Sequence, residues 1–125
     1  MKDQGLLKAI ATYFDAIYFC DVEKLDCVFH PSSSLFDADE NKIFVDPIAS
    51  FRQDVATRSS PASAKQVRNE EIILIDFLSK RCALVKVRLQ AHDNIFVDHL
   101  NFILNEENQW QIVSKVWHLE RVINY

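Results

Sequence analysis

The chain has 125 residues, of which 49% are hydrophobic and 26% charged, a composition that predicts one globular domain, 1–125. Its net charge is −4 and its basic residues form no stripe, and both observations argue against a nucleic-acid partner. No apolar run reaches transmembrane length, and the odd number of cysteines predicts reduced thiols, so we expect a cytoplasmic protein that does not contact a membrane.

The first part of the chain predicts two helices. Apolar residues recur at spacings of three and four over 4–20, which indicates an amphipathic helix. Asp21 is then a suitable N-cap for a short helix over 22–29, and Pro31 predicts its end. The residues expected to face the core on the first helix are Leu6, Ile10, Tyr13, Phe14 and Ile17.

Two short strands and a third helix follow. The strands are predicted over 33–39 and 42–46. Asp46 as N-cap and Pro47 at the first helical position predict the start of the helix. Residues 57–65 are polar and broken by a proline, so we expect a loop that borders the sheet.

Residues 70–120 predict a four-stranded antiparallel meander, because four apolar runs are separated by short polar breaks. The breaks are Ser79-Lys80, Asp93-Asn94 and Glu107-Asn108. With two-residue turns at the last two breaks, the expected register pairs His92 with Ile95, Leu104 with Gln111 and Leu100 with Lys115.

Alternation along these strands sorts their side chains onto two faces. The core face is predicted to carry Ala83, Val85, Val87, Leu89, Ala91, Phe96, Asp98, Leu100, Phe102, Leu104, Val113, Lys115, Trp117 and Leu119. Asp98 and Lys115 are the charged exceptions, and the register makes them diagonal neighbours at roughly 7–8 Å. They form either a ligand-orienting or acid/base pair in an apolar cavity, or a structural ion pair that fixes the strand register.

The opposite face mixes apolar and polar side chains. Its apolar members are predicted to be Ile95, Val97, Ile103, Trp110, Ile112 and Val116. An apolar patch of this size usually has a partner, so we expect a two-fold homodimer through this outer sheet face.

The order of elements resembles the nuclear transport factor 2-like superfamily over essentially the whole chain. A helix and a short helix precede Phe29-His30-Pro31, and short strands, a helix and a meander ending in WQIVSKVWH follow. The segment DHLNFILNEENQWQIVSKVWH is especially similar to the putative lumazine-binding and SnoaL-like branch, although His99 stands where that branch more often has Tyr. The resemblance implies an α+β, cystatin-like cone: a curved antiparallel sheet packed against three N-terminal helices, with a pocket between them.

The resemblance also suggests site residues. In the ketosteroid isomerase relatives, an aromatic hydroxyl on the first helix and an Asp on the first strand perform the chemistry, and Tyr13 and Asp37 match these positions by offset. The second acid of that family falls near Leu100, which cannot donate a hydrogen bond. The candidate catalytic residues are therefore Asp98, Lys115, Tyr13 and Asp37. For Tyr13 the alternative is a core tyrosine with a satisfied hydroxyl, and for Asp37 it is a turn residue before Asp39-Glu40; these structural roles are the more common ones.

Two classes of function follow from these expectations. The first is a pocket for a small, flat, partly polar ligand, or a SnoaL-like or ketosteroid-isomerase-like lyase or isomerase. The second is a non-catalytic dimeric interaction or assembly module with a vestigial pocket. No cofactor is implied, and the histidines lack a third ligand at metal spacing, so no metal site is expected. The expected pocket walls are Leu89, Leu100, Phe102, Val113 and Trp117.

Overall fold

The computed structural model describes residues 3–123, which form three helices and six strands. The elements in chain order are α1 (Gln4–Phe19), α2 (Val22–Val28), β1 (Phe29–Asp37), β2 (Phe44–Pro47), α3 (Ile48–Thr57), β3 (Glu70–Ser79), β4 (Cys82–Ala91), β5 (Asn94–Leu104) and β6 (Trp110–Val122). The predicted α+β class is confirmed.

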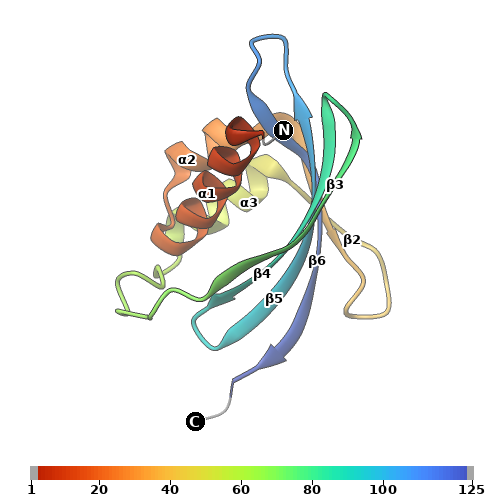
Figure 1. Ribbon diagram of the computed structural model, residues 1–125. Helices are drawn as coiled ribbons and strands as arrows, with labels where there is room; N and C mark the ends of the chain where they lie inside the picture. The colour runs from red at the N-terminus through yellow and green to blue at the C-terminus, as the bar shows by residue number, and fades with distance from the viewer. Residues whose placement is uncertain (1–2, 124–125) are drawn as a thin grey trace.

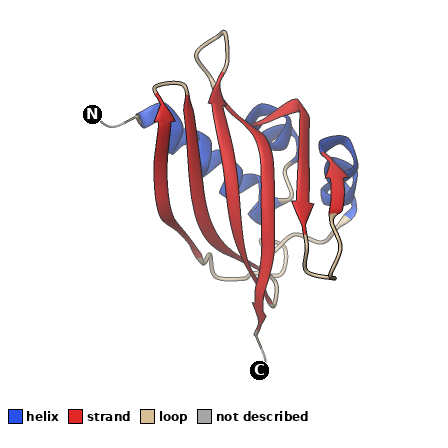
Figure 2. Ribbon diagram, turned by 90° about the vertical axis from the view of Figure 1, so that its right-hand side faces the viewer, coloured by secondary structure: helices blue, strands red, loops and turns tan. Residues whose placement is uncertain are grey.

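The six strands form one curved sheet, and the three helices lie together on one side of it (Figures 1 and 2). The strand order is β2-β1-β6-β5-β4-β3. Strands β3 to β6 pair antiparallel in sequence, as the meander predicts. The sheet is nevertheless mixed, because β1 pairs parallel with β6. This pairing places the N-terminal strands beside the C-terminal strand.

The helices form where the sequence predicts and bury the predicted stripe. The side chain of Asp21 accepts hydrogen bonds from the first backbone amides of α2, so its role as N-cap is confirmed. Leu6 and Ile10 are each 1% exposed and Ile17 is 8% exposed, which places this face of α1 in the core. None of the helices within residues 3–123 is long and apolar enough to cross a lipid bilayer.

Two predicted helix boundaries are wrong. Helix α2 ends at Val28, and Phe29 already begins β1 because it pairs with Ile112 of β6. Asp46 does not cap α3, since it lies in β2 as the register partner of Leu35. Pro47 takes the N-cap position without a side-chain hydrogen bond. Strand pairing therefore determines the structure at both boundaries.

The turn between β4 and β5 lies one residue earlier than expected, which shifts the pairing of the two strands by two residues. Ala91 pairs with Asn94, so His92 and Asp93 form the turn and His92 has a φ of 56°. A shift of two residues leaves each side chain on its predicted face, because side chains alternate with period two. The side chains of β4 and β5 therefore keep their predicted faces although the predicted partners are wrong.

A bulge in β6 changes the faces of its first residues. Leu100 pairs with Lys115 as predicted, but Phe102 pairs with Ile112, so Val113 is the additional residue. Trp110 is 6% exposed and Ile112 is fully buried in the core, whereas both were predicted on the outer face. Val113 moves the opposite way, and it lines a shallow outer-face hollow instead of the cavity.

Candidate functional site

A cavity of about 230 Å³ lies between the helices and the sheet. Helices α1 and α3 and strands β2, β4, β5 and β6 contribute to its wall, which is largely apolar and aromatic. This volume is below the roughly 300–1,000 Å³ of sites for drug-sized molecules, so it suits a small molecule. The lining residues are Tyr13, Ile17, Phe44, Asp46, Phe51, Asp54, Arg58, Leu89, Ala91, Phe96, Asp98, Lys115 and Trp117.

Tyr13 of α1 and Asp98 of β5 meet in this cavity although they are 85 residues apart in sequence. The Tyr13 hydroxyl donates a hydrogen bond of 2.5 Å to Asp98 Oδ2, and both residues are almost fully buried. Asp98 faces inward because it lies two residues before Leu100 and four before Phe102, and side chains at this spacing share the core side of β5. The second oxygen, Asp98 Oδ1, is buried and has no hydrogen-bond partner among residues 3–123.

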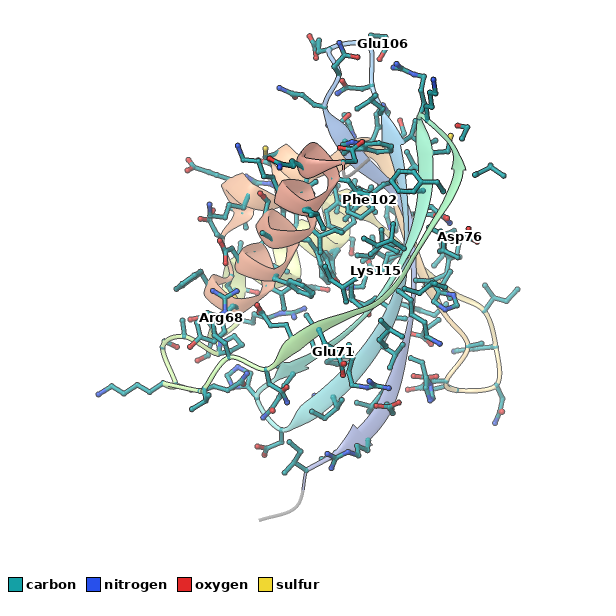
Figure 3. All side chains as sticks on the ribbon, viewed as in Figure 1. Arg68, Glu71, Asp76, Phe102, Glu106 and Lys115 are labelled. Atoms are coloured by element: carbon teal, nitrogen blue, oxygen red, sulfur yellow. The ribbon has the colours of Figure 1, made fainter. Side chains whose placement is uncertain are left out.

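Lys115 of β6 completes the polar cluster, and Figure 3 labels it between the helices and the sheet. Its Nζ lies 3.9 Å from Asp98 Oδ2, longer than a hydrogen-bonded ion pair. The same ammonium lies 4.8 Å from the ring centre of Phe51, 5.3 Å from that of Tyr13 and 5.8 Å from that of Trp117. Aromatic faces attract a cation, so three rings hold Lys115 at the cavity wall.

Burial shifts the pKa of each member of this cluster in the direction that favours the neutral form of its side chain. Desolvation raises the pKa of Asp98, although the charge of Lys115 and the hydrogen bond from Tyr13 oppose the shift. Desolvation likewise lowers the pKa of Lys115, and the charge of Asp98 opposes it. The pKa of Tyr13 rises well above its usual value through burial and the adjacent Asp98. The cluster therefore combines acidic and basic groups whose protonation states a bound ligand or a change of pH can alter.

Three further charged residues, Asp46, Asp54 and Arg58, line the cavity, and sequence reasoning did not place them there. Asp46 of β2 is 7% exposed, and its side chain makes no hydrogen bond or ion pair within residues 3–123. Arg58, which follows α3, is exposed, and its guanidinium lies 5.5 Å from the ring centre of Phe51. The sequence held no clear signal for Asp46, because its position before Pro47 favoured a helix cap and the exposure of its neighbours Phe44 and Val45 is visible only in the structure.

The family described as putative lumazine-binding matches residues 1–118 of the chain. The chain belongs to this family. The match covers every residue of the cavity wall. No curated protein sequence matches the chain significantly.

Solved structures similar to this family member share its fold. A nuclear transport factor 2-like protein of unknown function from Silicibacter pomeroyi has a TM-score of 0.81 at 21% identity, covering 94% of each chain. A protein from Shewanella baltica with the same description has a TM-score of 0.80 at 20% identity, covering 92% of this chain and 90% of its own. A ketosteroid isomerase-like protein from Erwinia carotovora atroseptica has a TM-score of 0.65 at 10% identity, covering 88% of this chain and 89% of its own. These likenesses confirm a nuclear transport factor 2-like fold.

In this lumazine-binding family member, the candidate residues divide into two groups. Tyr13, Asp98 and Lys115 come together, and the wall residues Leu89 and Trp117 line the same cavity. The others lie elsewhere: Leu100 and Phe102 are buried in the core, Val113 is on the outer face, and Asp37 lines a separate hollow and accepts a hydrogen bond from the backbone amide of Asp39.

The structure supplies an acid beside Tyr13 that the family resemblance did not identify. The resemblance aligned the second acid near Leu100, but Leu100 is buried in the core behind the cavity. The residue that contacts the tyrosine hydroxyl is Asp98, one strand repeat earlier on the same face. The cavity therefore does contain a tyrosine–acid pair.

Proposed function

We propose that this protein binds a small, flat, partly polar molecule in the cavity between its helices and its sheet. The observation that carries the proposal is the buried cluster of Tyr13, Asp98 and Lys115 within aromatic walls. Buried polar groups are costly unless they are hydrogen-bonded, so a ligand that pairs with them is favoured at this site. The family description supports the proposal, because lumazine is a small fused heterocycle of this kind.

A lyase or isomerase activity is the catalytic form of this proposal. Asp98, with a raised pKa, exchanges a proton with the ligand, while Lys115 donates a hydrogen bond to the developing negative charge and Tyr13 holds the Asp98 carboxyl in position. Asp37 is left out of this set because it does not line the cavity. The test is turnover of small enolisable ketones by the protein and by Asp98→Asn, and loss of all turnover in the variant is the expected result.

Ligand binding is tested by screening small flat heterocycles for thermal stabilisation of the protein. Ala91→Phe fills part of the cavity from β4, and Ala49→Phe on the exposed side of α3 is the matched control. We expect compounds that raise Tm in the wild type and in Ala49→Phe to lose this effect in Ala91→Phe. Equal stabilisation of both variants, or no stabilisation by any compound, contradicts the proposal.

A second candidate function is a dimeric interaction or assembly module with a vestigial pocket. Its support is the outer sheet face, where Leu74, Ile103 and Val116 are 49%, 40% and 47% exposed. This face is less apolar than the sequence predicts, because Trp110 and Ile112 lie in the core. Two-fold packing of the outer faces would cover the exposed apolar side chains.

Sedimentation at micromolar concentration tests the dimer. We expect a particle of about twice 14.5 kDa, and Val116→Glu at the centre of the face should convert it into a monomer. A wild-type protein that sediments as a monomer would remove the support for this interface.

A further inference from the structure

The cavity contains both an unpaired acceptor and an undersatisfied donor. Asp98 Oδ1 is buried without a partner among the described residues, while Oδ2 of the same carboxylate already accepts from Tyr13. Lys115 carries three N–H groups, but within residues 3–123 its Nζ makes no hydrogen bond, and the nearest carboxylate oxygen is Asp98 Oδ2 at 3.9 Å. A ligand can therefore satisfy both residues at once if it presents an N–H beside an acceptor.

The sheet register places a second carboxylate on the other side of Lys115. Lys115 pairs with Leu35 of β1, and Leu35 pairs with Asp46 of β2, so the three residues form one row across the inner face. Asp46 and Lys115 are thus two strands apart, at roughly 10 Å between their backbones, a distance that a lysine side chain spans in part. Across the sheet from β5 to β2, the wall therefore presents an acceptor (Asp98), a donor (Lys115) and a second acceptor (Asp46).

We infer that the ligand is a lactam or cyclic urea on a small flat ring system, bound by the edge that carries its adjacent N–H and C=O groups. The N–H donates to Asp98 Oδ1, and the C=O accepts from Lys115 Nζ. In a cyclic urea, the second N–H points toward Asp46. This inference rests on the proposed binding function, and it specifies the chemical group that the cavity recognises.

Other simple ligands fit the same wall less well. A carboxylate or phosphate could pair with Lys115 and with Arg58, which also lines the cavity, but it would leave the buried Asp98 Oδ1 without a donor. An amine could pair with Asp98, but it would place a second cation beside Lys115. A hydrocarbon would leave both polar groups unpaired.

The aromatic rings around Lys115 support a flat ligand. Phe51 of α3 and Trp117 of β6 both lie within 6 Å of the ammonium, so a ring bonded to Lys115 through its carbonyl lies among aromatic side chains. Offset or edge-to-face contacts with these rings favour a planar molecule over a bulky one.

The test compares compounds of nearly the same shape that differ at this edge. Quinazoline-2,4-dione and lumazine share the cyclic urea edge on different ring systems, and 1,3-dimethylquinazoline-2,4-dione keeps both carbonyls but has no N–H. Titration calorimetry on the wild-type protein should give both parent compounds a Kd about ten- to a hundredfold lower than that of the dimethyl compound. This comparison needs no variant.

Three variants separate the contributions of the two residues. In Asp98→Asn, the amide oxygen would accept from Tyr13 and the amide NH₂ would face the ligand, so binding of the parent compounds should weaken to the level of the dimethyl compound. Lys115→Met should weaken all three compounds by similar factors, because all three retain the carbonyl. Lys86→Met, on the outer face beside His99, is the control and should change none of the affinities.

Each outcome decides a different point. Equal binding of all three compounds by the wild type, or an N–H preference that persists in Asp98→Asn, overturns the inference and leaves the proposed binding function standing. Binding of lumazine alone overturns it too, because the ring and not the edge would then be recognised. If none of the three binds while other heterocycles in the screen do, the inference alone fails. If no compound binds at all, the proposed function fails with it.

Discussion

The interaction between Asp98 and Lys115 can be measured in a double-mutant cycle that combines Asp98→Asn with Lys115→Met. Their charged atoms are 3.9 Å apart, and the two residues are 1% and 7% exposed. Two unit charges at about 4 Å attract each other by about 4 kcal/mol at an effective dielectric constant of about 20. If both groups are ionised in the folded protein, we expect a coupling free energy near this value, because solvent does not screen the pair.

The assay is chemical denaturation of the four proteins at pH 7, which gives their free energies of unfolding and hence the coupling. The exposed pair Arg52–Asp26 is the control, measured with Arg52→Met and Asp26→Asn. Its atoms are closer, at 2.7 Å, yet its coupling should be much smaller because water screens it. A coupling below about 0.5 kcal/mol for Asp98 and Lys115 would mean that their effects are additive. Recognition of a ligand by a charged pair would then be refuted.

Three further predictions follow from the structure. Tyr13→Phe should lower the free energy of unfolding by about 1–3 kcal/mol, because it leaves buried Asp98 Oδ2 without its donor; no loss of stability in denaturation would contradict this hydrogen bond. Burial raises the folded-state pKa of Asp98 above its usual 3.8, so the folded state holds this proton to a higher pH than the unfolded state does. The stability of the wild type relative to Asp98→Asn should therefore fall as the pH rises from about 4 through the folded-state pKa, and a rise in relative stability instead would show a depressed pKa. Trp110→Ala should destabilise the protein by about 3–5 kcal/mol, because the indole is buried in the core. A loss of stability below about 1 kcal/mol in thermal or chemical denaturation would instead indicate an exposed indole.

The sequence predicts most of the fold because periodicity and capping are local signals. The stripe of α1 and the Asp21 cap need only neighbouring residues to be recognised, and both are present in the structure. The inward position of Asp98 and Lys115 also follows from alternation within a strand, which is unchanged when the strand pairing shifts by two residues. The site was therefore partly visible as two charges in an apolar pattern.

The remaining errors come from interactions between distant parts of the chain. The parallel pairing of β1 with β6 extends β1 back to Phe29, and no local signal reports it. The antiparallel pairing of β1 with β2 holds Asp46 in the sheet instead of at a helix cap. The bulge at Val113 leaves no local signal either, because Trp110, Ile112 and Val113 are all apolar and so satisfy either face assignment. Asp37 matched a family position by offset, but only the three-dimensional structure shows that it lies outside the cavity.

Because of the bulge, the faces occupied by the side chains at one end of β6 do not determine the faces occupied at the other end. Inserting one residue into a regular strand moves the side chains of all residues beyond it to the opposite face. A change of length near Trp110 would therefore normally move Lys115 and Trp117 out of the cavity wall and onto the outer face. An irregularity between them can absorb such a change, in the way Val113 does here. Relatives can therefore vary the loop at 105–109 and the packing under α1 while conserving the cavity wall. Length differences in this hairpin are then a poor guide to whether two relatives share a ligand, and the residues at positions 98 and 115 are a better one.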